Sequence, residues 1–152
     1  MRDRGGPRFQ RGARQPPQLP SGYLQSGYFD ANGNLWPELI QQWPEEIAQT
    51  FKQQGLSSTQ LRRFFNKARA LEKELDMKNF QRLKEDILTL KPIAAASVGR
   101  KTAPETFKQF IDRNINLVVS SSEPDAFTRG FLTHFQSVVA YLKYYEEKDK
   151  RR

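Results

Sequence analysis

Apolar residues recur at helical spacing through most of the region 57–148, and this periodicity constrains the fold more than any other feature. The clearest stretch begins with Ser57 and Gln60, which fit the S-x-x-Q pattern of a helix capping box. The apolar positions after it keep the spacing of one helix face: Leu61, Phe64, Phe65, Ala68, Leu71 and Leu75. No useful length of this region has the period of a strand, so the pattern predicts an all-α fold.

One helical pattern precedes this stretch and three follow it. The preceding helix has Ile47 and Phe51 on its apolar side, opens or kinks at Pro44 and ends at Gly55. The following helices are predicted over about 78–91, 104–120 and 123–148. Together these patterns predict a single helical bundle of about five helices.

Two helix boundaries carry specific expectations. Pro92 should bend its helix rather than end it, because proline removes one backbone hydrogen bond. The small apolar run 93–98 then continues to Gly99, which is expected to stop the helix. Ser122 together with Asp125 is expected to cap the last helix.

The first 22 residues differ in composition from the rest. They are rich in Arg, Gly, Pro and Gln, and Asp3 is their one acidic residue. Such a segment buries too little apolar surface to offset its ordering entropy, so residues 1–22 are predicted to be a disordered basic arm. The arm is suited to lying along RNA phosphates, and a solubilising tail is the alternative. Its arginines are Arg2, Arg4, Arg8, Arg11 and Arg14.

Residues 23–36 form an aromatic segment with an Asn32-Gly33 turn signal. It is predicted to dock on the helical body as an extended segment or small hairpin, with a partner surface as the alternative. The helical domain is then expected over 37–148, followed by a charged tail over 149–152.

Composition excludes several classes of site. The 152-residue chain contains no cysteine, which removes disulfides, thiolate nucleophiles, iron–sulfur clusters and cysteine zinc sites. No apolar run approaches the roughly 20 residues that cross a membrane, and no apolar core follows the basic N-terminus, so a cytoplasmic protein without a secretory signal is expected. The net charge of +8 favours a polyanionic partner.

Catalytic machinery is not evident in the sequence. The one histidine, His134, has no carboxylate three or four residues away on either side, and a structural or surface role is expected for it. The chain has no Walker-type or G-x-G-x-x-G motif. We therefore expect no enzyme activity, no metal and no cofactor.

Positive charge is concentrated in the central helices. Residues 59–101 contain eleven basic and five acidic residues, an excess of +6. Helical spacing places Arg62, Arg69 and Lys73 in one stripe, with Arg63 and Lys67 beside it. Such a stripe can neutralise successive phosphates without reading bases, although a solvated basic helix face is the alternative. The phenylalanines have core spacing, so recognition of backbone or shape is expected.

Three blocks of sequence carry a family resemblance: 58–62, 90–100 and 131–145. In this order they resemble the small subunit of type III-A CRISPR–Cas effector complexes, the small helical protein of the Csm complex. The resemblance implies a non-catalytic helical protein in antiviral defence. It also implies several copies stacked beside other effector subunits, along the channel that holds guide RNA paired with target RNA.

The resemblance assigns RNA-backbone contacts to Arg62, Lys91 and Arg100, although Pro92 departs from the smooth helix expected after Lys91. Charge geometry adds four more candidates: Arg63, Lys67, Arg69 and Lys101. Two other functions stay open, a stand-alone helical nucleic-acid-binding protein and a protein–protein adaptor. A homodimer of the free subunit also stays open.

Overall fold

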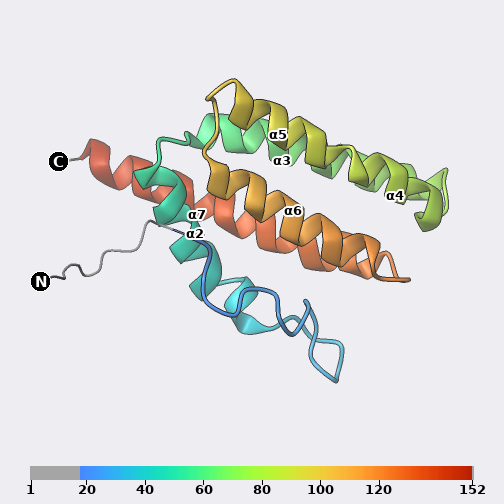
Figure 1. The fold of residues 1–152 in the computed structure, drawn as a ribbon. Coiled ribbons are helices and arrows are strands. Elements are labelled where there is room, and N and C mark those ends of the chain that lie inside the picture. The colour runs from blue at the N-terminus through green and yellow to red at the C-terminus, as the bar shows by residue number, and fades with distance from the viewer. Residues whose placement is uncertain (1–17, 152) are drawn as a thin grey trace, which may run out of the picture.

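Helices make up most of residues 18–151, which the computed structural model describes (Figure 1). The all-α bundle predicted from the sequence is confirmed. Most of the predicted basic arm, residues 1–17, lies outside the described residues. The elements in chain order are η1 (Pro37–Leu39), α2 (Gln42–Gln53), α3 (Ser58–Glu72), η2 (Lys73–Asp76), α4 (Phe80–Leu88), α5 (Leu90–Gly99), α6 (Glu105–Val119), η3 (Ala126–Phe131) and α7 (Leu132–Lys150).

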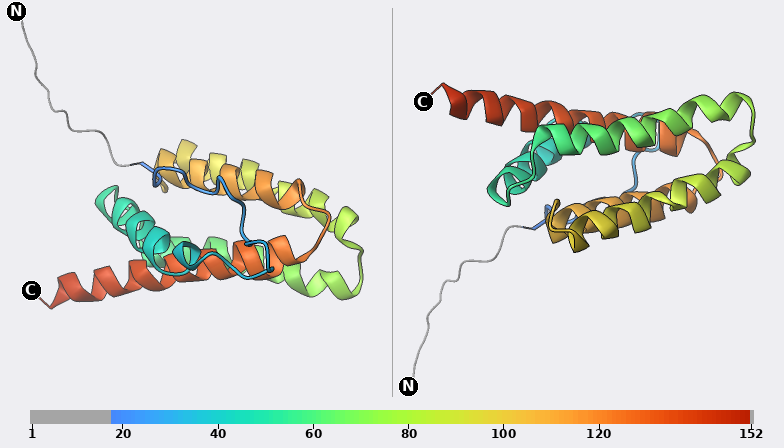
Figure 2. Two further views of the ribbon diagram at one scale, coloured as in Figure 1. Left: turned by 90° about the horizontal axis from the view of Figure 1, so that it is seen from below. Right: turned by 90° about the horizontal axis from the view of Figure 1, so that it is seen from above.

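The helices form two layers, as Figure 2 shows. One layer contains α2, α3 and α7, and the other contains α4, α5 and α6. The short helix η2 turns the chain from the first layer to the second, so α3 and α5 lie on the same side of the molecule in opposite layers. This turn creates the space between α3 and α5 that is described below.

Aromatic rings fill the core between the layers. Phe110 and Phe135 lie at its centre, with edge-to-face geometry and ring centroids 5.3 Å apart. Phe64 and Phe65 of α3 pack edge-on against Phe107 and Phe135, respectively. Edge-to-face pairs add to the stabilisation that comes from removing ring area from water.

The N-terminal aromatic segment belongs to this core. Tyr23 and Tyr28 are buried, and their hydroxyls enter a network with Asn114 of α6 and His134 of α7. The Tyr28 hydroxyl donates to Asn114 Oδ1 at 2.8 Å, and Asn114 Nδ2 donates to the Tyr23 hydroxyl oxygen at 2.9 Å. The Tyr23 hydroxyl lies 2.6 Å from His134 Nε2. Residues 23–28 are thus held to both layers.

The direction of each hydrogen bond in this network is fixed. His134 Nδ1 lies 2.7 Å from the carbonyl oxygen of Leu39, which can only accept, so Nδ1 carries the ring proton. Nε2 then accepts from the Tyr23 hydroxyl. The second Asn114 amide hydrogen reaches the Phe110 carbonyl oxygen at 2.8 Å. The buried tyrosine hydroxyls, the Asn114 amide and the His134 ring therefore all have hydrogen-bond partners, as buried polar groups require.

A short hairpin follows this network. Residues 30–34 turn the chain, and Phe29 and Leu35 form an antiparallel bridge, which is the one β pairing within residues 18–151. The Asp30 carboxylate accepts from the backbone N–H groups of Asn32 and Asn34 at 2.8 and 3.0 Å. Gly33 has φ +81°, the left-handed conformation that its Asn-Gly signal predicts.

The predicted bend near Pro92 occurs earlier in the chain. The helix is interrupted at Thr89, where α4 ends and α5 begins. Pro92 has no N–H to donate to the Leu88 carbonyl oxygen, and its ring crowds that preceding turn, so the distortion falls N-terminal to the proline.

The cap predicted for the last helix from Ser122 and Asp125 is wrong. Asp125 makes no capping bond, because its carboxylate pairs with Arg129 one turn later at 3.3 Å. The neighbouring hydroxyl of Ser121 instead accepts from the Glu123 backbone N–H at 3.1 Å. The helix also begins as the π-helix η3 before it continues as α7.

The C-terminal end of α7 extends into the predicted charged tail. Asp149 lies within the helix and its carboxylate forms an ion pair with Lys52 of α2. Glu146 of α7 accepts from the Ser58 backbone N–H at 2.7 Å, at the first turn of α3. The Glu146 carboxylate is favourable there, because the N-terminus of a helix carries partial positive charge. Together the two contacts join α7 to both other helices of its layer, α2 and α3.

Candidate nucleic-acid interface

A groove of about 630 Å³ lies between α3 and α5. Residues of both helices line it, so each layer of the bundle contributes one wall. Its lining residues are Gln60, Arg63, Phe64, Asn66, Lys67, Ile93, Ser97, Arg100 and Thr102.

The α3 wall is fixed by the capping box predicted from the sequence. The Ser57 hydroxyl accepts from the Gln60 backbone N–H at 3.1 Å, and the Gln60 side chain accepts from the Ser57 backbone N–H at 3.2 Å. Arg63 and Lys67 then lie four residues apart, on the same face of the helix. Phe64 lies between them in sequence and is only 6% exposed, so its ring belongs mainly to the core.

The α5 wall ends in a Schellman motif. The Thr102 backbone N–H donates to the Ser97 carbonyl oxygen, and the Lys101 N–H donates to the Val98 carbonyl oxygen, both at 2.9 Å. The helix ends at Gly99 as predicted, but the left-handed residue is Lys101, with φ +63°. Arg100 is left exposed at the end of the helix, with its guanidinium 3.5 Å from the Ser97 hydroxyl.

The groove has a one-sided charge. Three of its lining residues are cationic, namely Arg63, Lys67 and Arg100, and none is a carboxylate. Within the described part of the chain, Arg63 and Lys67 form no ion pair.

Several cations elsewhere are neutralised by acids. Lys78 lies 2.9 Å from Glu74 and 2.6 Å from Asp86, and hydrogen bonds to these carboxylates raise the pKa of Lys78. Lys108 is paired with Asp112 at 2.7 Å, and its pKa is raised for the same reason. The groove is therefore a place where positive charge is left for an external anion.

The structure separates the seven predicted binding residues. Arg63, Lys67 and Arg100 come together at the groove. Arg62 and Arg69 are exposed on α3 about a third of a turn away from Arg63 and Lys67, so they belong to a different flank.

The remaining two predicted residues lie outside the groove. The Lys91 ammonium donates to Asn116 Oδ1 of α6 at 2.6 Å, which directs it toward the neighbouring helix. Lys101 lines a separate depression of about 190 Å³ beside Gln54 and Gly55. Thr102 lines both, so the depression adjoins the groove.

Four uncharged polar residues of the groove were not predicted: Gln60, Asn66, Ser97 and Thr102. A spacing of three residues from Arg63 gives Gln60 and Asn66, and the same spacing from Arg100 gives Ser97. This spacing could have identified these polar residues from the sequence, but only after Arg63 and Arg100 were known to face the groove.

Comparison with known families gives one match. A family model described as Csm2 Type III-A matches residues 35–148. The chain belongs to this family. Membership makes it a small subunit of the type III-A Csm complex, a CRISPR effector, in agreement with the resemblance seen in the sequence. No curated protein and no solved structure matches the chain.

The Csm2 match includes the seven predicted binding residues and the whole groove. Tyr23 and Tyr28 precede it, although both contribute to the core. Residues 18–34 are thus part of the described fold beyond the segment that the family match includes.

The histidine of this Csm2 chain is structural. His134 is completely buried, and burial lowers its pKa to about 4, although the Leu39 hydrogen bond acts in the opposite direction. It is therefore neutral at physiological pH. Burial also raises the pKa of Tyr23 and Tyr28, so both hydroxyls stay protonated as donors.

Within the described residues, His, Asp and Glu side chains form no cluster of three or more suited to a metal ion. The helices among them also lack the combination of length and apolar character that spanning a bilayer requires.

Proposed function

We propose that this effector subunit is non-catalytic and binds the sugar-phosphate backbone of guide or target RNA through the α3–α5 groove. The observation that carries the proposal is the cluster of Arg63, Lys67 and Arg100 on a surface that has no carboxylate. Bound RNA would release condensed counterions from its phosphates, which favours association.

The two walls of the groove supply complementary groups. An arginine guanidinium presents a planar set of donors that fits phosphate oxygens, and a lysine ammonium acts as a compact point charge. Arg63 and Lys67 would approach a strand from α3, and Arg100 would approach it from α5. Gln60, Asn66 and Ser97 provide neutral hydrogen-bonding groups for phosphate or ribose oxygens.

Sequence independence follows from what the groove lacks. Base stacking needs an exposed aromatic ring, and the one aromatic lining residue, Phe64, is almost fully buried. Contacts to phosphate and sugar fix a strand in place without distinguishing bases.

The absence of catalysis is supported by the state of His134. A general base must reach its substrate, but both ring nitrogens of His134 already have buried partners in Tyr23 and Leu39. The role proposed is therefore architectural: holding RNA and assembling with copies of itself and other effector subunits in the cytoplasm, as part of antiviral defence.

Fluorescence anisotropy with single-stranded RNA across a salt series tests the groove. The test variant is Arg63→Gln/Arg100→Gln, and Arg62→Gln/Arg69→Gln on the other flank is a matched control with the same loss of charge. Two RNAs of unrelated sequence should bind equally to the wild type, with a log–log salt slope of about −2 for three phosphate contacts. The groove variant should bind more weakly, with a slope smaller in magnitude by about 1.4.

Equal effects of the two double variants would show that binding follows net charge and would contradict the groove assignment. A second measurement separates the alternatives: copurification of the tagged subunit with the other effector subunits and guide RNA. A stand-alone nucleic-acid-binding protein would bind RNA tightly but would not copurify. An adaptor would copurify while its RNA binding stayed unchanged in the groove variant.

A further inference from the structure

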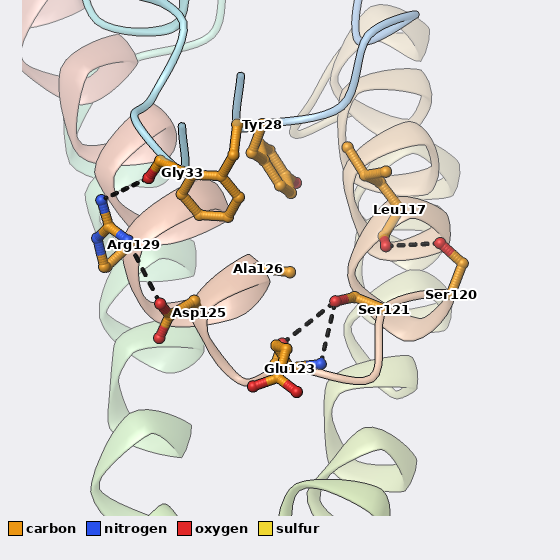
Figure 3. A pocket seen from close by; sticks show the side chains of 10 residues that line it. Tyr28, Gly33, Leu117, Ser120, Ser121, Glu123, Asp125, Ala126 and Arg129 are labelled. Carbon is orange, nitrogen blue, oxygen red and sulfur yellow. Dashed lines mark hydrogen bonds and ion pairs between the residues drawn. The ribbon is translucent and has the colours of Figure 1, made fainter. Parts of the chain in front are cut away.

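A second hollow of about 380 Å³ lies at the end of the bundle where the chain passes from α6 into η3 (Figure 3). Tyr28, Phe29, Leu117 and Ala126 provide its apolar walls. We call it the end pocket. It lies in a different part of the molecule from the α3–α5 groove and shares no lining residue with it.

The walls of the end pocket are held in place by contacts of their own. The Tyr28 hydroxyl is anchored on Asn114. The Arg129 guanidinium lies 5.0 Å from the centre of the Phe29 ring, and it also contacts Asp125 and the Gly33 carbonyl oxygen, each at 3.3 Å. Figure 3 shows the contacts of Arg129 with Asp125 and Gly33 on one side of the pocket and Leu117 on the other. The pocket is thus preformed, which lowers the cost of binding.

The rim of the end pocket is acidic. Glu123 is exposed and has no ion pair among residues 18–151, while Asp125 is shared with Arg129. The lining residues therefore have a net charge of −1, in a chain whose overall charge is +8. An apolar side chain flanked by cations would fit both the walls and the rim.

We propose that the end pocket binds the N-terminal segment 1–17 of a second copy of this chain. Phe9 is the one aromatic residue of that segment, and Arg8 and Arg11 lie beside it in sequence. Phe9 enters the apolar pocket, and the neighbouring arginines meet Glu123 and Asp125. The segment as a whole has five arginines against one acidic residue.

The positions of the two sites favour a contact between copies. The described chain starts toward the end of the bundle where α7 finishes, and the loop before η3 lies at the opposite end (Figure 2). Within one chain, the segment would have to fold back along the bundle. Between copies placed end to end, it would leave one molecule beside the pocket of the next. Seventeen residues span at most about 60 Å, which is ample for either path.

A head-to-tail contact between copies can repeat from one molecule to the next without forming a closed ring, as in a filament.

A labelled synthetic peptide of residues 1–17 tests the pocket by fluorescence anisotropy, without RNA or other subunits. The host is the full chain with Phe9→Ala, so that its own segment competes less. We expect saturable binding that weakens about tenfold when the peptide itself has Phe9→Ala. Adding Glu123→Lys to the host should also weaken binding several-fold. The matched control is Glu85→Lys, the same charge change at an exposed position of α4.

If Glu123→Lys and Glu85→Lys affect binding equally, the pocket is not the site and the proposal is overturned. Sedimentation then decides which copy is bound. The wild-type chain should associate as its concentration rises, whereas the Phe9→Ala and Glu123→Lys chains should stay monomeric separately and form a pair when mixed.

A wild-type chain that stays monomeric at every concentration, while the peptide still binds the Phe9→Ala host, would place the segment in its own pocket. That result would overturn the proposed contact between copies. Because RNA is absent throughout, none of these outcomes bears on the α3–α5 groove.

Discussion

Lys101 combines an unfavourable backbone conformation with a charge beside the groove. An L-residue with φ +63° is strained by its Cβ, at a cost of roughly 1–2 kcal/mol, and glycine removes that strain. Part of the gain is offset by the greater entropy of glycine in the unfolded chain. Lys101→Gly is therefore expected to raise the free energy of unfolding by up to about 1 kcal/mol in urea denaturation.

Lys101→Ala separates backbone strain from charge. It removes the same ammonium group but keeps Cβ, so its stability should not rise. A gain as large as that of Lys101→Gly would show that the charge, and not the left-handed conformation, is the cause.

His134 predicts a loss of stability in mild acid. In the unfolded chain its pKa is about 6.5, and in the folded protein burial lowers it to about 4. Below pH 6.5 the unfolded state binds a proton that the folded state does not, so stability falls as pH decreases and the loss is complete near pH 4. The total is about 3 kcal/mol. Above pH 6.5 His134 contributes no pH dependence.

The measurement is urea denaturation at pH values from 7 to 4, comparing wild type with His134→Gln. Carboxylates titrate in both proteins, so the difference between their slopes isolates the histidine. Parallel curves would contradict a buried neutral His134.

At the scale of elements, two helical glycines should respond to alanine with opposite signs. A Cβ at Gly130 of η3 would lie 2.6 Å from Tyr28 Cγ and Cδ2, which is too close, and the ring is held by Asn114. Gly130→Ala should therefore destabilise the protein by about 1–3 kcal/mol.

Gly99 is the matched control, because no atom lies within 4 Å of its added Cβ. Gly99→Ala should stabilise the protein by up to about 1 kcal/mol, the gain expected from helix propensity alone. Thermal denaturation of both variants tests the pair. Stabilisation by Gly130→Ala would show that Tyr28 moves freely and that the described packing does not constrain it.

The same elements show where sequence patterns suffice. The capping box of Ser57 and Gln60 was predictable because it depends on residues three apart. The close packing of Gly130 in the π-helix η3 against the Tyr28 ring was not, because it joins residues about a hundred positions apart in the chain. The break at Thr89 was displaced from Pro92 because a proline acts on the turn before it.

At the scale of the whole molecule, the aromatic segment should be essential for folding. Removing residues 1–36 would leave Asn114 and His134 buried without their tyrosine partners, at about 1–3 kcal/mol for each unsatisfied group. The burial of Tyr23 and Tyr28 would also be lost. The sum is comparable with the stability of a typical domain, so cooperative unfolding should disappear.

Near-UV circular dichroism and urea denaturation of the shortened chain test this expectation. The single variants Tyr23→Phe and Tyr28→Phe keep the rings and should lose only about 1–3 kcal/mol each. Cooperative unfolding of the shortened chain at the wild-type midpoint would contradict the role given to the segment.

The binding surface could be predicted only in part. Helical spacing found Arg63 and Lys67 as neighbours, because one helix contains both. It could not bring Arg100 to them, since that depends on the turn at η2 and the pairing of layers. Nor could spacing within α5 show that Lys91 would be engaged by Asn116 of another helix.

The fixed directions of the Tyr28–Asn114–Tyr23–His134 network have an evolutionary consequence. Tyr28 donates to Asn114, and each later group accepts a hydrogen from one neighbour and donates one to the next, ending at the Leu39 carbonyl oxygen. A substitution that reverses one link leaves two donors or two acceptors facing each other in the core. Compensation then requires a second change at a neighbouring link. In relatives that share residues 18–34, these four positions are therefore expected to be inherited as a set and replaced together, rather than one at a time.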